Sequence, residues 1–185
     1  AGLRLIDRRT EIMLEVMRRT LEAANGKVDM LSLGEDLGTQ RGPTISLDLF
    51  RRHIRPRLQK FADLGRQWNI PVMLHSCGSS SWAFDDLIEM GIGVVDTLQP
   101  EARDMAPADL KRRFGKALSF HGCISTAGPL AYGTADEVVR DVRRTLEIMM
   151  PGGGYALSPT HAIQSNSPTE NVVAMYEAAR EYGRY

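Results

Sequence analysis

Histidine and cysteine side chains stand where short apolar segments of this sequence end. The segment PVMLHSCG places His75 and Cys77 two residues apart, directly after an apolar run. Residues i and i+2 of an extended chain point to the same side, so an imidazole nitrogen and a thiolate sulfur can reach one ion. Mixed nitrogen and sulfur donors favour zinc over magnesium or calcium. The pair predicts part of a zinc site, and Gly78 allows the backbone to turn directly after it.

Two ligands hold zinc poorly, so a third ligand must come from another segment. Cys123 and His161, which follow two later apolar segments, are the candidates. Three protein ligands would leave the fourth position open, as in catalytic zinc sites. The alternative is a closed structural site built from HSC at 75–77 and HGC at 121–123. That alternative is less favoured because a predicted strand at 93–98 separates the two segments.

Other polar residues follow apolar segments of the same kind. Glu35 and Asp36 come after the first segment, in LSLGEDLG, and Gln99 follows the third, in DTLQPEA. Glu35 or Asp36 could donate a proton, or accept a hydrogen bond from a metal ligand. A turn cap is the simpler interpretation of Asp36. Gln99 and Arg41 are candidates for orienting a substrate.

The elements that must position these residues alternate along the chain. Short continuous apolar runs predict five strands, at 28–33, 71–75, 93–98, 117–122 and 154–159. Helical periodicity fills the intervals, at 2–24, 46–68, 81–90, 107–114, 134–150 and 167–182. Continuous apolar runs are typical of strands buried on both faces, and therefore of a parallel sheet. The carboxyl ends of parallel strands share one face, where the polar residues above should converge.

Two α/β architectures fit this alternation: an open doubly wound sheet, or about five β/α units of a (β/α)₈ TIM barrel. A complete barrel typically needs roughly 250 residues, whereas the chain has 185. No Gly-x-Gly-x-x-Gly follows the first strand, so a dinucleotide-binding fold has no support. We expect a single domain over 1–185, with a helix at 1–25 and five β/α units at 28–185.

Local signals mark several helix boundaries. Ser46 is the expected N-cap of the long second helix, and Thr134 with Glu137 forms a capping-box pattern. Ser167 is the expected cap of the last helix. Pro56 lies inside the long helix, where it should cause a kink or mark a weak point.

Composition narrows the class of function. Basic and acidic residues balance at 23 each, so no excess positive charge is present to hold nucleic acid or an anionic membrane. No apolar run approaches the roughly 18 residues of a membrane helix, and the charged opening AGLRLIDRRTEIM is unlike a signal peptide. Two cysteines and nine methionines suit a reducing, cytoplasmic environment.

Four segments together carry a family resemblance: EDLGTQRGPTIS, HSCGS, LKRRFGKALSFHGCIS and PGGGYALSPTHAIQSNSPTENVVAMYEAA. Their order and spacing resemble the uroporphyrinogen decarboxylase superfamily, from about residue 28 to the C terminus. More narrowly, they resemble its corrinoid-dependent methyltransferase branch. The resemblance implies the C-terminal portion of a (β/α)₈ barrel. It also implies bound Zn²⁺, a corrinoid carried by a partner protein, and a small-molecule methyl donor or thiol acceptor.

The branches of this superfamily differ in their motifs. In the methyltransferases a His-x-Cys pair and a later cysteine bind zinc, and His75 and Cys77 match the pair. The later cysteine would fall near Gly153, where this sequence has only glycine, so His161 or Cys123 would have to replace it. The decarboxylases carry Gly-Asn-Leu-Asp-Pro where this chain reads GCISTAG, and Gly-His-Gly where it reads GGYALSP.

Methyl transfer involving a corrinoid protein is therefore the first functional hypothesis. A uroporphyrinogen decarboxylase-like carboxy-lyase of porphyrin biosynthesis, working without metal, is the alternative. A non-catalytic barrel fragment is the second alternative. An incomplete barrel would leave two exposed sheet edges and an uncovered apolar face, so we expect a homo-oligomer, or burial of that surface against further sequence.

Overall fold

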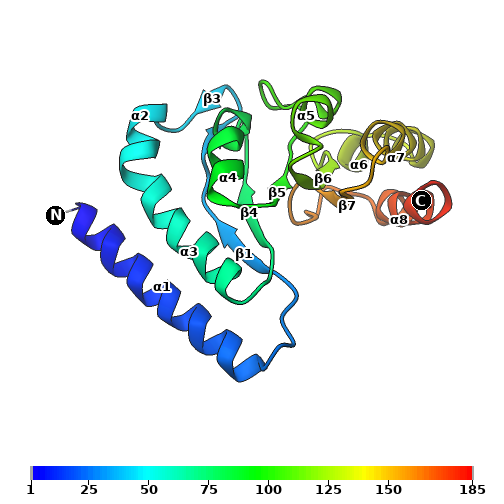
Figure 1. Ribbon diagram of the computed structural model, residues 1–185. Helices are drawn as coiled ribbons and strands as arrows, with labels where there is room; N and C mark the ends of the chain where they lie inside the picture. Colours follow the sequence, from blue (N-terminus) through cyan, green and yellow to red (C-terminus); the bar gives the residue numbers. More distant parts are fainter. Residues whose placement is uncertain (1, 185) are drawn as a thin grey trace.

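Five parallel strands form the central sheet of the computed structural model, which describes residues 2–184 (Figure 1). The strands are hydrogen-bonded in the order β1 (Leu31–Gly34), β4 (Val72–Ser76), β5 (Val94–Thr97), β6 (Ser119–Ile124) and β7 (Tyr155–Pro159). Every neighbouring pair is parallel. The five predicted strands are thus confirmed, with ends shifted by a few residues. Ala1 and Tyr185, the ends of the predicted 1–25 helix and 1–185 domain, lie outside the described residues.

Helices follow the strands in chain order around the sheet (Figure 1). The α-helices are α1 (Gly2–Ala24), α2 (Leu47–Leu49), α3 (Arg55–Gln67), α4 (Phe84–Met90), α5 (Pro107–Phe114), α6 (Pro129–Tyr132), α7 (Ala135–Met149) and α8 (Thr169–Tyr182). A 3₁₀ turn, η2 (Ser81–Ala83), precedes α4. A small antiparallel hairpin of β2 (Gly38–Thr39) and β3 (Gly42–Pro43) follows β1. The hairpin and α6 have no counterpart among the predicted elements, because neither contains an apolar run long enough to show a period.

Pro56 marks the point where the long second helix changes its geometry. The predicted helix at 46–68 consists of α2, a π-helical turn η1 (Phe50–Ile54), and α3, in whose first turn Pro56 lies. Proline lacks the N–H that an α-helix needs, and its ring crowds the carbonyl of the preceding turn. Widening that turn to a π-helix relieves the conflict, which confirms the predicted irregularity.

The helix caps agree with most of the local signals. Ser46 accepts a hydrogen bond from the backbone of Leu49, and Thr134 with Glu137 forms the complete capping box of α7. The cap predicted at Ser167 is displaced, because α8 begins at Thr169. Among residues 2–184, no helix combines the length and the apolar character needed to cross a bilayer.

One face of the sheet is packed against helices. Along β1, β4 and β5 the buried residues alternate with partly exposed ones, as a strand's two-residue period requires. The buried set packs with helix residues in one continuous core, which includes Leu33, Leu74, Val95, Phe61 and Leu110. In the described part of the chain, a helical layer therefore anchors the sheet on this side only.

Within residues 2–184, no helical layer covers the opposite face, which we call the bare face. Its residues are partly or fully exposed: Ser32, Gly34, Met73, His75, Val94, Asp96, Ser119, His121 and Ala156. An open cavity of about 590 Å³ lies against it, lined mostly by apolar atoms of β4, β5, β6 and β7. In a closed barrel the corresponding face would be the interior.

Candidate metal centre

Three polar side chains form a row across the bare face. His75 of β4 is paired in register with Asp96 of β5, which is paired in turn with His121 of β6. The Nδ1 atom of His75 lies 2.6 Å from Oδ2 of Asp96, and the Nδ1 atom of His121 lies 2.7 Å from Oδ1. A carboxylate only accepts hydrogen bonds, so each Nδ1 carries a proton. Each imidazole therefore keeps its Nε2 atom for another partner.

Cys77 meets His75 on the same side of the chain, as the spacing predicts. The Sγ atom of Cys77 lies 3.6 Å from Nε2 of His75. Asp36 completes the group, because its ligand atom and those of His75 and Cys77 all lie within 4.8 Å of one another. In the described part of the chain, this is the only such group of three or more histidine, cysteine, aspartate or glutamate residues.

Backbone and side-chain hydrogen bonds bring Asp36 to this position. The N–H of Cys77 donates to Oδ1 of Asp36 at 2.9 Å, and the N–H of Glu35 donates to the carbonyl of His75 at 3.0 Å. The N–H of Leu37 donates to the buried hydroxyl of Ser76 at 3.0 Å. The loop after β1 is thus fastened to the end of β4. Asp36 caps a neighbouring segment rather than its own turn.

Cys123 does not join the group, although the two-residue spacing from His121 suggested that it could. Gly122 and Cys123 have φ angles of 120° and 70°, so the chain is no longer extended here and the alternation of faces is lost. The Cys123 side chain turns into the hydrophobic core, where it is 2% exposed. Burial raises the pKa of its thiol to about 12. The closed site built from both His-x-Cys segments loses this ligand as well.

His161 also lies outside the group. It follows β7 on an exposed loop, and its Nδ1 atom lies 3.1 Å from the carbonyl oxygen of Ala162. Asp36, which the sequence suggested as a proton donor or hydrogen-bond acceptor, is the third potential ligand that the structure provides.

Gln99 and Arg41, the candidates for orienting a substrate, have different surroundings. The Oε1 atom of Gln99 accepts hydrogen bonds from the backbone of Gly78 at 2.7 Å and from the side chain of Gln40 at 2.9 Å. It therefore holds the turn that follows Cys77. Arg41 is exposed and lines a separate surface pocket of about 460 Å³.

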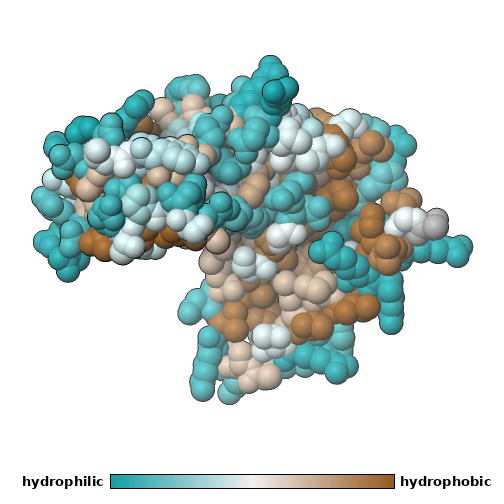
Figure 2. All heavy atoms as spheres, turned by 180° about the vertical axis from the view of Figure 1, so that it is seen from behind, coloured by the Kyte–Doolittle hydropathy of each residue, from teal (hydrophilic) through white to brown (hydrophobic). Residues whose placement is uncertain are grey.

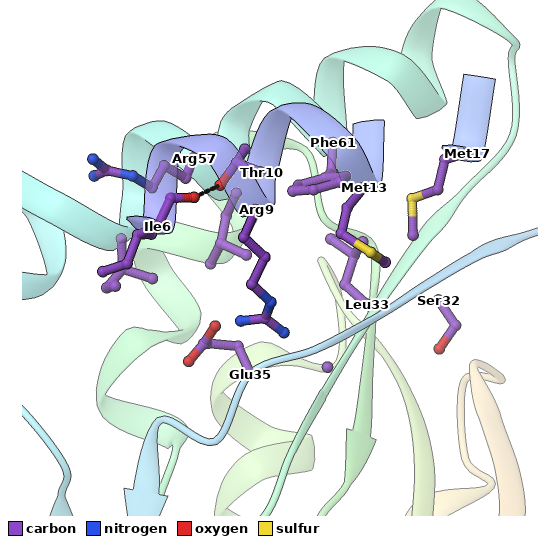
Figure 3. Close-up of a pocket in the computed structure, with 13 residues that line it drawn as sticks. Ile6, Arg9, Thr10, Met13, Met17, Ser32, Leu33, Glu35, Arg57 and Phe61 are labelled. Atoms are coloured by element: carbon purple, nitrogen blue, oxygen red, sulfur yellow. Dashed lines mark hydrogen bonds between the residues drawn. The ribbon is translucent and has the colours of Figure 1, made fainter. Parts of the chain in front are cut away.

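Glu35 faces a third pocket, of about 340 Å³, between α1, α3 and the free edge of β1. Figure 3 shows Glu35 and Arg9 pointing toward one another in this pocket, with Met13 and Phe61 on its apolar side. The metal group does not include Glu35. Glu35 thus lines this pocket, whereas the neighbouring Asp36 lies beside His75 and Cys77.

Hydrogen bonding and burial shift the pKa values of Asp96, His75 and the neighbouring Cys77. Burial acts to raise the pKa of Asp96, but hydrogen bonds from His121 and His75 outweigh it and bring the pKa to about 2. The hydrogen bond to Asp96 raises the pKa of His75. Burial, followed by the negative charges of Asp36 and Asp96, raises the pKa of Cys77. Cys77 is therefore a thiol at neutral pH until a cation supplies a compensating charge.

The donor atoms of the group fit zinc. An imidazole nitrogen, a sulfur and a carboxylate oxygen are ligands that zinc accepts, and three protein ligands leave a fourth position open. A sulfur donor disfavours magnesium and calcium. Zinc-binding histidines usually donate their other ring N–H to a carboxylate or carbonyl, and His75 does so to Asp96.

From the sequence, Asp96 has no predicted role, and His121 enters the predicted site only through the HGC segment of the closed alternative. A signal for Asp96 was nevertheless present, because it is the one charged residue of the run GVVDTL. An ionisable side chain inside a buried strand needs a partner, and His75 and His121 are its partners here.

Known proteins resemble this chain along most of its length. Two curated relatives are the methylcobamide:CoM methyltransferases MtaA of Methanosarcina barkeri and of its strain Fusaro / DSM 804. Each is 28% identical over 181 residues, which is 95% of this chain and 50% of the relative. A solved methyltransferase from Methanosarcina mazei matches with a TM-score of 0.66 and 24% identity, over 85% of this chain and 43% of that one. The chain thus spans about half the length of these relatives.

The fold and family expectations are confirmed by these matches. A five-stranded parallel sheet covering about half of the relatives fits the C-terminal part of a (β/α)₈ barrel. Both curated relatives are methyltransferases, in agreement with the branch that the motifs resemble. The sequence profile of the Uroporphyrinogen decarboxylase (URO-D) family matches residues 3–182. The chain belongs to the uroporphyrinogen decarboxylase family.

Proposed function

We propose that this chain carries the zinc site of a methyltransferase that moves a methyl group between a corrinoid protein and a small molecule, either a thiol acceptor or a methyl donor. The observation that carries the proposal is the convergence of Asp36, His75 and Cys77. The curated relatives are methylcobamide:CoM methyltransferases, which supports the reaction class.

Each residue of the site would have a separate role. His75 presents Nε2 and Cys77 presents Sγ to the metal, while Asp36 offers a carboxylate oxygen. Asp96 holds the His75 ring in the tautomer whose Nε2 is free. Zinc bound by these residues would provide the positive charge that deprotonates a coordinated thiol. Gln99 keeps the Gly78 turn in place, and the bare face gives a substrate access to the site.

Metal analysis of the purified protein tests this proposal. We expect about one zinc per chain by mass spectrometry of the metals, and loss of most of it in the His75→Ala and Cys77→Ser variants. Cys123→Ser is the matched control, because it removes the other sulfur donor, which lies in the core. It should keep its zinc. A wild-type protein without zinc, or equal loss from both cysteine variants, would contradict the proposal.

Activity separates the remaining alternatives. The zinc-loaded protein should transfer a methyl group from methylcobalamin to a small thiol, and the cobalamin absorbance should change accordingly. The family is named for a decarboxylase, and a metal-free protein that decarboxylates uroporphyrinogen would favour that alternative. A folded protein with neither zinc nor either activity would favour the non-catalytic fragment.

A further inference from the structure

We infer that His121 is a positioning residue of the metal centre, and that it acts on His75 through Asp96. The inference rests on the proposed zinc site and assigns a new member to it. The role follows from the contact between His121 and Asp96 in the tertiary structure.

The Asp96 carboxylate has one oxygen for each histidine. Oδ2 accepts the hydrogen bond from His75, and Oδ1 accepts the one from His121, at 2.6 and 2.7 Å. Hydrogen bonds to a charged acceptor are stronger than neutral ones. The Asp96 side chain is only 12% exposed, so water cannot easily replace a missing partner. With His121 in place, the carboxylate is held from both sides and directs Oδ2 to His75.

The position of His121 itself is built into the backbone. It is followed by Gly122, where a Cβ atom would collide with the backbone of Thr97 in β5. The hydroxyl of Tyr155 donates to the carbonyl of Gly122 at 2.8 Å from the other side. Strand β6 is therefore held close to β5 at this point, which places the His121 ring within reach of Asp96.

His121 has no competing role that would explain its hydrogen bond. Its side chain is 37% exposed on the bare face, and within residues 2–184 its Nε2 atom has no hydrogen-bond partner. It is also not in the metal group. A histidine that served only the packing of the core would be buried, so the contact with Asp96 is the interaction that distinguishes this position.

A double-mutant cycle on zinc affinity tests the inference. Asp96→Ala should weaken zinc binding 10- to 100-fold, as loss of a partner behind a metal ligand usually does, and His121→Leu should weaken it by roughly tenfold. The Asp96→Ala/His121→Leu double variant should bind no more weakly than Asp96→Ala alone. His121→Asn places an amide N–H close to the position of Nδ1, and it should restore affinity to within about threefold of wild type. A competing chromophoric chelator measures each affinity.

A second measurement needs no zinc. In the metal-free protein, ¹⁵N NMR of the imidazole rings should show His75 with its proton on Nδ1, and His121→Leu should reduce that population or speed the exchange of the proton. The inference would be overturned if the losses of zinc affinity in Asp96→Ala and His121→Leu multiplied in the double variant. It would also be overturned if the His75 ring did not respond to His121→Leu. Either result would leave the zinc site intact. A wild-type protein that binds no zinc would instead contradict the proposed function.

Discussion

Asp96 is the residue on which the charge balance of the site depends. It receives hydrogen bonds from two histidines, and it supplies the negative charge that favours a cation beside Cys77. Asp36 adds a second negative charge from the neighbouring loop. Two carboxylates, a thiol and an imidazole form an arrangement that is better satisfied with a bound cation than without one.

The pKa shifts predict how the stability of the metal-free protein depends on pH. The pKa of Asp96 is lowered from 3.8 to about 2, so its contribution is present above about pH 4 and is lost as the pH falls through 2. The pKa of His75 is raised above 6.5, so its contribution is complete below pH 6.5 and is lost as the pH rises through the raised value. The advantage of wild type over Asp96→Asn should therefore be largest between about pH 4 and 6.5.

Urea unfolding at several pH values, with zinc removed by a chelator, measures this advantage. Asp63→Asn is a suitable control, because Asp63 pairs with Arg66 on the solvent side of α3, where an ion pair contributes little. If the difference in the free energy of unfolding between wild type and Asp96→Asn did not change with pH, the Asp96 carboxylate and the His75 imidazole would not be coupled.

At the level of elements, the ends of β5 and β6 determine the shape of the site. Leu98 directly follows β5, and Cys123 lies near the end of β6. Their φ angles are 58° and 70°, in a region that residues with side chains rarely adopt. Gly122 adopts 120°, which is open essentially to glycine alone. Strain of this kind persists only where surrounding structure imposes it, and it often lies near functional sites.

Gly122 should therefore tolerate no side chain. Gly122→Ala would combine an unfavourable φ with a collision against the backbone of Thr97, and we expect it to lower the free energy of unfolding by about 2 kcal/mol or more. It should also weaken zinc binding, because β6 carries His121. Gly93→Ala, at the start of β5, has open space around the new Cβ and is the control. Urea unfolding that gives the two variants equal stability would contradict this account of β6.

The surface of the whole molecule includes open strand edges and exposed apolar residues. Among residues 2–184, the outer strands β1 and β7 each have one edge that pairs with no other strand. The bare face between them carries apolar side chains such as Met73 and Val94. Helix α1 adds further exposed apolar residues, including Leu5, Ile12 and Val16. Figure 2 shows apolar side chains gathered along this helix. Exposed edges and apolar patches of this kind favour association.

Self-association of the chain by itself is the prediction at this scale. Size-exclusion chromatography with light scattering should show a dimer or larger assembly whose fraction rises with concentration. Met73→Glu, on the bare face, should weaken the assembly, because it would bury a charge. Val173→Glu, on the exposed side of α8, is the control and should leave it unchanged. A monomer at all concentrations, or equal effects of both variants, would contradict the prediction.

Local patterns in the sequence were sufficient to determine much of this protein. Continuous apolar runs and helical periods depend only on neighbouring residues, and they predicted the five parallel strands, the α7 capping box and the irregular turn before Pro56. The two-residue period of a strand likewise predicted that His75 and Cys77 share one side. The motifs indicated the family without any knowledge of contacts.

Only the tertiary structure decided which residues complete the site. Asp96 meets its two histidines because the register of three separate strands aligns them, and Asp36 reaches Cys77 through hydrogen bonds between two loops. Cys123 is withdrawn because two positive φ angles interrupt the alternation of its strand. Strand register, contacts between loops and single-residue backbone geometry depend on residues far apart in the chain, so a periodic pattern read along the sequence contains no information about them.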